Sequence, residues 1–342
     1  MKRMLVALIS LLMILPQINR GYACTSFAVY SEEPVYAMNF DYPETEIRFI
    51  VVDNSDLKAF FMQFDYMTYK EGNQFASTLG MNSKGLFTTL QMQYPQLTGK
   101  RNKKKDEIYI YELVDFCAGS ENVPEVLRAV ENRKFIHMEG LTLHSMLADT
   151  EGNAVIAEVG KDQNELLPIT GDFIVMTNFK NSDYRDKPFN KVSGAGADRY
   201  IKAWQYIEEN RDGFCLDNAL ECLKMTAQQY QYPTLASAVF VPGEQSVYIA
   251  LRREFEKLWK ISLQDGTIEA YKGFEENIKF TIPDEGVLAS DLLNNDFSKY
   301  EAFNAAESSA DGSKTGFIYP VIAASVIAVL LLIYLFRKWQ KA

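Results

Sequence analysis

Two apolar segments lie at the ends of this 342-residue chain and limit where a folded domain can form. Near the N-terminus, Lys2 and Arg3 precede an uncharged run from Met4 to Leu15, and Gly21-Tyr22-Ala23 offers small residues to a signal peptidase. The run is shorter than the about 20 residues that span a bilayer. The pattern predicts a signal peptide over residues 1–23, removed before Cys24. An uncleaved anchor and a lipid-modified Cys24 are two alternatives.

The other apolar segment predicts a membrane anchor. Phe317 to Phe336 contains no charged residue over 20 positions, and Arg337, Lys338 and Lys341 follow it. Basic residues stay on the cytoplasmic side of a span. We therefore expect a transmembrane helix over 316–336, a cytoplasmic tail over 337–342, a polar tether over 290–315 and a catalytic domain over 24–289. The protein would be single-pass in the cell membrane, with this domain on the extracytoplasmic side.

Between these segments, about 290 residues are enough for one large domain. The net charge of −10 argues against a nucleic-acid surface. One basic cluster, from Lys100 to Lys105, predicts a solvated loop, with attraction to anionic lipid or substrate as the alternative. Nothing has the spacing of a metal-ligand cluster, so no metal or cofactor is expected.

Three further cysteines, Cys117, Cys215 and Cys222, cannot all pair within the chain. Cys215 and Cys222 lie seven positions apart in a predicted helix, which separates them by roughly 10 Å. That distance is too long for a disulfide. We expect all three to be small buried apolar residues.

The hydrophobic pattern alternates between strand and helix periods along the domain. Alternation with many Val, Phe and Tyr residues predicts strands over 25–52, 76–90, 142–159, 172–178 and 234–263. Apolar residues three and four apart predict helices over 106–118, 123–132, 198–210 and 216–229. A turn at Asn82-Ser83-Lys84-Gly85 would close a hairpin. This order indicates two sheets with helices packed on them.

Cys24 would carry both a thiol and a free α-amino group once the signal peptide is removed. A free cysteine has a pKa of about 8.5 and an α-amino group one of about 7.7–8.0. The amine can therefore accept the thiol proton near neutral pH, as it does for N-terminal threonine nucleophiles. Attack on a carbonyl produces an oxyanion that needs two donors about 3 Å away, and asparagine side chains can serve.

Several short motifs, in order from residue 24 to about 280, resemble the choloylglycine hydrolase family of N-terminal-nucleophile enzymes. They are Cys24-Thr25-Ser26-Phe27, Asn39-Phe40-Asp41-Tyr42, Gly80-Met81-Asn82-Ser83-Lys84-Gly85-Leu86, Leu143-His144-Ser145-Met146-Leu147-Ala148-Asp149, Thr177-Asn178-Phe179 and Asp198-Arg199-Tyr200. The resemblance implies cleavage of linear amides such as bile-salt conjugates, penicillin V or related N-acyl compounds. It also implies an α+β fold of four layers, the αββα sandwich.

The resemblance implies a role for each of five residues. Cys24 would be the nucleophile with its own amine as base, and Asp41 would orient that amine. Asn82 would donate to the oxyanion, and Asn178 would position the amine or assist the oxyanion hole. Arg199 would lie near Cys24 and Asp41, where its charge favours the thiolate.

The sequence departs from the family in two places. Met38 stands where the family has an arginine directly before the Asn39-Phe40-Asp41 motif, which argues against bile salts as substrate. Only about 20 residues separate Asn178 from Arg199. The family's longer segment here helps to build a tetramer, so that tetramer is not expected.

We therefore expect a hydrolase that cleaves a linear, non-peptide amide bond of a small N-acyl compound through a thioester. Acyl transfer or ceramidase-like hydrolysis of a lipid amide on the same fold is one alternative. A surface-anchored binding protein without catalysis, consistent with Met38, is another.

Overall fold

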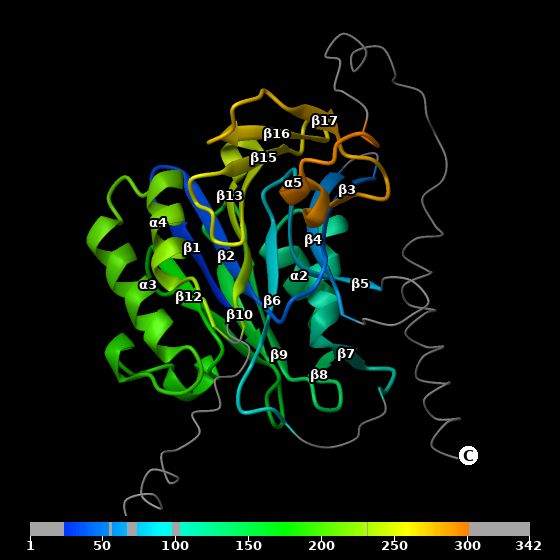
Figure 1. Cartoon of the computed structure of the whole chain (residues 1–342). Coiled ribbons are helices and arrows are strands. Elements are labelled where there is room, and N and C mark those ends of the chain that lie inside the picture. The colour runs from blue at the N-terminus through cyan, green and yellow to red at the C-terminus, as the bar shows by residue number, and fades with distance from the viewer. Residues whose placement is uncertain (1–23, 55–56, 67–73, 98–102, 231, 301–342) are drawn as a thin grey trace, which may run out of the picture. The chain divides into compact units, whose positions relative to one another are not determined.

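A computed structural model describes residues 24–54, 57–66, 74–97, 103–230 and 232–300 of the chain (Figure 1). The predicted signal peptide, the predicted transmembrane helix and part of the basic cluster lie outside these residues. Among the described helices, none is long and apolar enough to cross a membrane. The signal peptide and the transmembrane helix therefore remain predictions.

The domain is built on two eight-stranded sheets whose neighbouring strands are all antiparallel. The first sheet has the order β12 (Phe173–Met176), β1 (Thr25–Tyr30), β2 (Pro34–Asp41), β13 (Thr234–Val241), β14 (Ser246–Leu251), β15 (Leu258–Ser262), β16 (Thr267–Lys272) and β17 (Lys279–Thr281). The second has the order β11 (Glu165–Pro168), β10 (Ala154–Glu158), β9 (Leu143–Ala148), β6 (Phe87–Met92), β5 (Phe75–Asn82), β4 (Leu57–Asp65), β3 (Ile47–Asn54) and β18 (Val287–Leu288).

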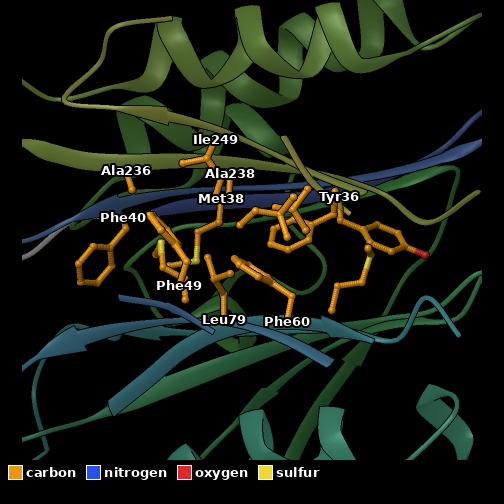
Figure 2. Packing of buried hydrophobic residues seen from close by; sticks show 14 of the residues in the cluster. Tyr36, Met38, Phe40, Phe49, Phe60, Leu79, Ala236, Ala238 and Ile249 are labelled. Atoms are coloured by element: carbon orange, nitrogen blue, oxygen red, sulfur yellow. The ribbon is translucent and has the colours of Figure 1, made fainter. Parts of the chain in front are cut away.

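The two sheets pack face to face through alternate residues of their strands (Figure 2). Met38 and Phe40 of β2 point across to Phe60 of β4 and Leu79 of β5. Because successive side chains of a strand point to opposite faces, each strand gives half of its residues to this layer and half to the helices outside. We call the space between the sheets the inner layer.

Helices cover the outer face of each sheet, which completes four layers. α3 (Ala197–Asn210) and α4 (Leu216–Thr226) pack on the first sheet, and α2 (Val123–Val130) and the 3-10 helix η1 (Ile110–Ala118) pack on the second. The expected αββα arrangement is therefore present. Residues 107–109, predicted as helix, instead form β7 (Glu107–Tyr109), which pairs in parallel with β8 (Lys134–Ile136). Shorter 3-10 turns are η2 (Asn181–Tyr184), η3 (Phe189–Lys191) and η4 (Pro242–Glu244).

The Asn82–Gly85 hairpin turn joins β5 to β6 where the sequence predicts it. Gly85 has a φ of +83°, and a Cβ there would lie 2.4 Å from Cγ2 of Thr150. Glycine is the residue that adopts this conformation without steric cost. The turn thus requires glycine for both its backbone and its packing.

The described cysteines are unpaired, and two of the three that follow Cys24 in the chain are buried. Cys117 and Cys222 lie in the core, as expected, but Cys215 is exposed. Cys215 is the N-cap of α4 rather than part of its buried face, because the helix begins one residue later.

Residues 289–300 pack on the domain, although 290–315 is the predicted tether. α5 (Ala289–Asn294) buries Leu292. The Tyr300 ring stacks on Phe280 at 4.6 Å, and Phe297 lies 5.8 Å from Trp259. Aromatic residues in a polar segment gain free energy by covering apolar surface, which is why the domain continues to residue 300.

A chain that ends at residue 288 should be less stable than one that ends at residue 300. Burial of Leu292, Phe297 and Tyr300 contributes roughly 1.5–3 kcal/mol per fully buried side chain, so the shorter chain should lose at least about 3 kcal/mol. Urea unfolding of both chains measures the difference. Equal midpoints would show that residues 289–300 add nothing to the fold.

Candidate active site

Cys24 lies directly before β1, at the end of the first sheet where β1 begins and β2 ends. Its side chain belongs to the inner layer, and the residue is 6 % exposed. Its Sγ is 3.9 Å from the backbone oxygen of Asp41, the last residue of β2. The pairing of Thr25 with Asn39 fixes this approach, because it brings the start of β1 beside the end of β2.

The Asp41 carboxylate is fully buried among donors. Its Oδ1 accepts a hydrogen bond from Thr234 Oγ1 at 2.5 Å, and its Oδ2 accepts one from Gln228 Nε2 at 2.9 Å. Arg199 Nη1 is 3.8 Å from the same Oδ2. Burial raises the pKa of Asp41 to about 6, although Arg199 and the two donors oppose that rise. The carboxyl group therefore titrates just below neutral pH.

The Arg199 guanidinium reaches from α3 to the start of β1. Its Nη1 donates to the backbone oxygen of Cys24 at 2.6 Å and to Oγ1 of Thr25 at 2.8 Å. Its Nη2 donates to Oδ1 of Asn178 at 3.1 Å. A Cβ on Gly196, which has a φ of +78°, would lie 2.5 Å from Nη2. Glycine before α3 thus leaves room for the cation.

Asn178 follows β12 and joins the two sheets. Its Nδ2 donates to the backbone oxygen of Met92 at 2.7 Å, and its own backbone oxygen accepts from Tyr94 N at 2.7 Å. Because Met92 ends β6 of the second sheet, Asn178 fixes the end of that strand next to Arg199. Four of the five predicted site residues, Cys24, Asp41, Asn178 and Arg199, therefore lie together.

The Cys24 thiol is protonated at rest. Burial, followed by the charge of Asp41, raises its pKa to about 12, while the Asp41 backbone and Arg199 act in the opposite direction. A thiol with this pKa needs a base at the moment of attack, since only the thiolate is a strong nucleophile. An α-amino group on the same residue would supply that base.

Asn82 does not join the other four residues. Its Nδ2 donates to the backbone oxygens of Cys117 at 2.9 Å and Ser120 at 2.7 Å, and its Oδ1 accepts from Lys84 N and Leu86 N. It precedes β6, whereas Asn178 contacts the far end of that strand. Six residues of strand separate Leu86 from Met92, or about 20 Å. The side chain holds a turn in place and is not placed as an oxyanion donor.

Two glutamines of β6 and its continuation have polar side chains buried in the domain, and Gln91 contacts β1. Gln91 and Gln93 alternate with outward residues and face the inner layer, where the Gln91 amide lies 2.7 Å from Ser26 Oγ. Gln93 is 1 % exposed, and its Oε1 has no hydrogen-bond partner among the described residues. The sequence does contain a signal for these amides, because Gln91 and Gln93 are polar residues at alternate positions of an otherwise apolar strand.

Next to Gln91 in the second sheet lies a buried pair, His144 of β9 and Glu158 of β10. His144 lies opposite both Gln91 and Glu158, and its Nδ1 is 3.3 Å from Glu158 Oε1. The Glu158 carboxylate also accepts from Asn181 N at 2.6 Å and Ser182 N at 3.0 Å. Burial raises the pKa of Glu158, but His144 and these N–H groups together lower it to about 2. The pair anchors the chain just after Asn178.

Glu158→Gln should lower the free energy of unfolding by about 3 kcal/mol, because an amide N–H₂ would face donors that now bind a buried carboxylate. Because the pKa of Glu158 is lower in the folded state, this contribution is present above about pH 4.5 and is lost as the pH falls towards about 2.

Glu165→Gln, on the neighbouring strand β11, is the matched control for this change. Glu165 pairs with the exposed Arg185 at 3.1 Å and should cost less than about 1 kcal/mol. Chemical denaturation between pH 3 and pH 7 compares the two variants, and equal losses would contradict the anchoring role.

Met38 fills the inner layer beside the site. It is fully buried, and Thr89 Oγ1 lies 2.8 Å from its Sδ. Phe40, Phe60 and Leu79 are among its neighbours in the packed layer (Figure 2). A charged side chain at this position would therefore be buried among apolar groups. No group of three or more metal-binding side chains occurs in the described part of the chain.

Comparison with known proteins supports the fold. No family profile and no curated protein matches the sequence. A mutant of conjugated bile acid hydrolase from Clostridium perfringens is similar in structure, with a TM-score of 0.51 and 16 % identity over 76 % of this chain and 97 % of that one. Penicillin V acylase from Agrobacterium tumefaciens has a TM-score of 0.51 and 16 % identity over 72 % of this chain and 90 % of the other.

These two neighbours define the class of fold. The chain has the αββα architecture of the N-terminal-nucleophile hydrolases, and its resemblance to the choloylglycine hydrolases is confirmed at the level of the fold.

Proposed function

We propose that the protein is a cysteine N-terminal-nucleophile hydrolase that cleaves the linear, non-peptide amide bond of a small N-acyl compound. One observation carries this proposal: Asp41 and Arg199, both buried, converge on Cys24 at the start of β1. Structural neighbours that act on bile acid conjugates and penicillin V support the reaction class.

Catalysis would begin with removal of residues 1–23, which frees the α-amino group of Cys24. The amine takes the thiol proton while sulfur bonds to the substrate carbonyl carbon. Collapse of the tetrahedral intermediate breaks the carbon–nitrogen bond, and the amine's proton passes to the leaving nitrogen. Water then hydrolyses the thioester, which releases the acid and restores the thiol.

The neighbouring side chains take distinct parts in this scheme. Ionised Asp41 accepts a hydrogen bond from the new amine and orients it. Arg199 holds the Cys24 carbonyl and offsets the Asp41 charge. We assign oxyanion donation to the Gln93 side-chain amide rather than to Asn82, because strand alternation turns the buried Gln93 towards the inner layer while Asn82 is held in a turn. Asn178 keeps the two strand ends together.

Acyl transfer to an amine and hydrolysis of a lipid amide would use the same first step. The apolar segment over 316–336 favours a lipid-like substrate, and it places the domain at the extracytoplasmic face of a membrane in our proposal. The acyl chain would lie near Phe40, Tyr42 and Phe64, whose rings contact one another beside Cys24 at 4.9–5.5 Å.

A binding protein without turnover is the second candidate, and Met38 favours it. Met38 stands where the family has an arginine, so Arg199 is the cation that acts on the thiol, and its effect does not prevent burial from raising the Cys24 pKa to about 12. A buried neutral thiol reacts slowly. The same group of residues around Cys24 would then bind N-acyl amides and release them unchanged. Turnover measurements separate the two candidates.

Cys24→Ser should lower kcat/KM for N-acyl amide hydrolysis about a thousandfold or more, because the nucleophile and its base act as a unit. The measurement uses the full chain after removal of residues 1–23. Cys215→Ser changes an exposed cysteine outside the site and should keep full activity.

A chain that retains one glycine before Cys24 tests the amine itself. This form keeps the thiol but blocks the base, so it should lose activity as severely as Cys24→Ser. Unchanged turnover in the extended chain would overturn the mechanism. Absence of turnover in the processed wild type, over a broad panel of N-acyl compounds, would favour the binding protein.

Asp41 should give the unprocessed chain a distinctive pH dependence. The folded state holds the Asp41 proton up to about pH 6, whereas an unfolded chain releases it near 3.8. The folded state therefore binds more protons between these values, so its stability falls as pH rises from about 4 to about 6. Asp41→Asn should flatten this slope in thermal unfolding curves, and Asp53→Asn, at an exposed strand residue, should leave it intact.

A further inference from the structure

Two buried polar atoms of the second sheet have no hydrogen-bond partner among the described residues. They are Nε2 of His144 and Oε1 of Gln93, and the two residues are 0 % and 1 % exposed. Buried polar atoms of folded proteins are nearly always hydrogen-bonded, either to protein groups or to enclosed water. These two atoms therefore call for a partner, and their positions indicate which one.

His144 and Gln93 lie on neighbouring strands and face the inner layer. His144 of β9 is opposite Gln91 of β6, and Gln93 N donates to Thr142 O at 2.9 Å, so Gln93 lies one inward position further along. His144 and Gln93 are thus diagonal neighbours on one face, with about 7–8 Å between their Cα atoms. Long side chains reach across such a pair, and one water molecule joins two polar atoms about 5 Å apart.

Glu158 fixes the direction of the His144 ring and the place of its proton. The Glu158 carboxylate accepts hydrogen bonds from Asn181 N and Ser182 N and lies 3.3 Å from His144 Nδ1. An ionised carboxylate only accepts, so Nδ1 carries a proton and Nε2 of the neutral ring is an acceptor. The two ring nitrogens point almost opposite ways. Since β10 lies on one side of β9 and β6 on the other, Nε2 faces the side of β6.

The neighbouring Gln91 amide is held at both ends, in contrast to that of Gln93. With its amide oriented to satisfy both ends, Gln91 Oε1 accepts from Ser26 Oγ at 2.7 Å and Ser26 N at 3.1 Å, and Nε2 donates to Thr177 O at 3.3 Å. No group in the described part of the chain holds Gln93 Oε1 in this way. The partner of that oxygen therefore decides which way the Gln93 amide faces.

A shared partner for the two atoms has to donate twice, because both atoms are acceptors. A hydroxyl group donates only once, whereas water donates twice and is small enough to be enclosed between the sheets. Asn178 bonds Met92 O and Tyr94 N on either side of Gln93, so Gln93 lies nearer to the site than His144 does. A water on the His144 side of Gln93 turns the amide nitrogen towards the site.

We propose that His144 is a positioning residue for the oxyanion hole. A water molecule bound between His144 Nε2 and Gln93 Oε1 holds the Gln93 amide with its nitrogen towards the substrate oxygen. The inference rests on the proposed function for the reaction and for the donor role of Gln93. The opposite amide orientation would place a carbonyl oxygen against the oxyanion, which destabilises the transition state.

Asparagine and glutamine at position 144 separate the two contacts of the ring. His144→Asn keeps an amide nitrogen for Glu158 but has no group at the Nε2 position. It should keep most of the stability and lower kcat about tenfold or more with little change in KM, because the oxyanion forms only after substrate binding. His144→Gln places an amide near the Nε2 position and loses the Glu158 contact, so it should be the less stable and the more active variant.

The measurement uses the chain from which residues 1–23 have been removed and the best substrate of an N-acyl amide panel, together with urea unfolding of each variant. If His144 served only the fold, activity would follow stability and His144→Asn would be the more active variant. That order would overturn the inference.

His137→Asn is the matched control at the other histidine of the chain. His137 Nδ1 lies 2.8 Å from the backbone oxygen of its neighbour Met138, so this variant should keep full kcat. Gln93→Met removes the amide at similar length and should lower kcat about a hundredfold. His144→Asn should add no further loss to Gln93→Met, and losses that multiply would contradict a shared water.

A neutron crystal structure tests the water without any turnover, because it locates the protons. The wild type should show a water within about 3.2 Å of both atoms, with one proton directed at each. A Gln93 oxygen that faces Cys24 or bonds a protein donor would refute the inference even where hydrolysis is found. A bound water in a chain that hydrolyses no N-acyl compound would support the positioning of Gln93 by His144 and refute the proposed function alone.

Discussion

The buried guanidinium of Arg199 is the interaction on which the site depends. It joins α3, the start of β1, the end of β12 and the carboxylate of Asp41 through one side chain. A buried charge is tolerated only when its donors are satisfied, and loss of one partner of such a pair typically costs about 3–5 kcal/mol. The free energy that stabilises the cation therefore also fixes the position of Cys24, so stability and site geometry have the same physical origin.

The second sheet contributes hydrogen-bonding groups to the site, whereas Cys24 precedes a strand of the first sheet. Asn178 holds the end of β6, and Glu158 holds the backbone just beyond Asn178. These contacts cross the boundary between the sheets at one end of an otherwise apolar inner layer. The sheets can thus pack by burial over most of their area, while their relative position at the site is fixed by directional hydrogen bonds.

Sequence patterns were sufficient for the layered fold, for physical reasons, and the family resemblance pointed to four residues that the structure brings together: Cys24, Asp41, Asn178 and Arg199. Strand and helix periods follow burial on one face, and Gly85 and Gly196 satisfy steric needs that only glycine meets. Asn82 shows the limit of such reasoning. Its motif predicts a turn, but it does not show whether that turn lies near Cys24. Gln93 was not singled out from the sequence, because whether an inward residue of the second sheet lies at the site depends on how the two sheets pack on each other. The fold of residues 290–300 was missed because it depends on distant aromatic partners.

If residues 1–23 are removed as we propose, the high pKa of the buried Cys24 thiol also affects how the unprocessed chain reacts. Disulfide exchange and oxidation need a thiolate that is accessible to solvent. A precursor that has already folded presents neither condition at Cys24. Under the proposed function, the nucleophile would therefore be protected from oxidation until residues 1–23 are removed. By the same reasoning, the exposed Cys215 is the thiol that redox chemistry would reach first.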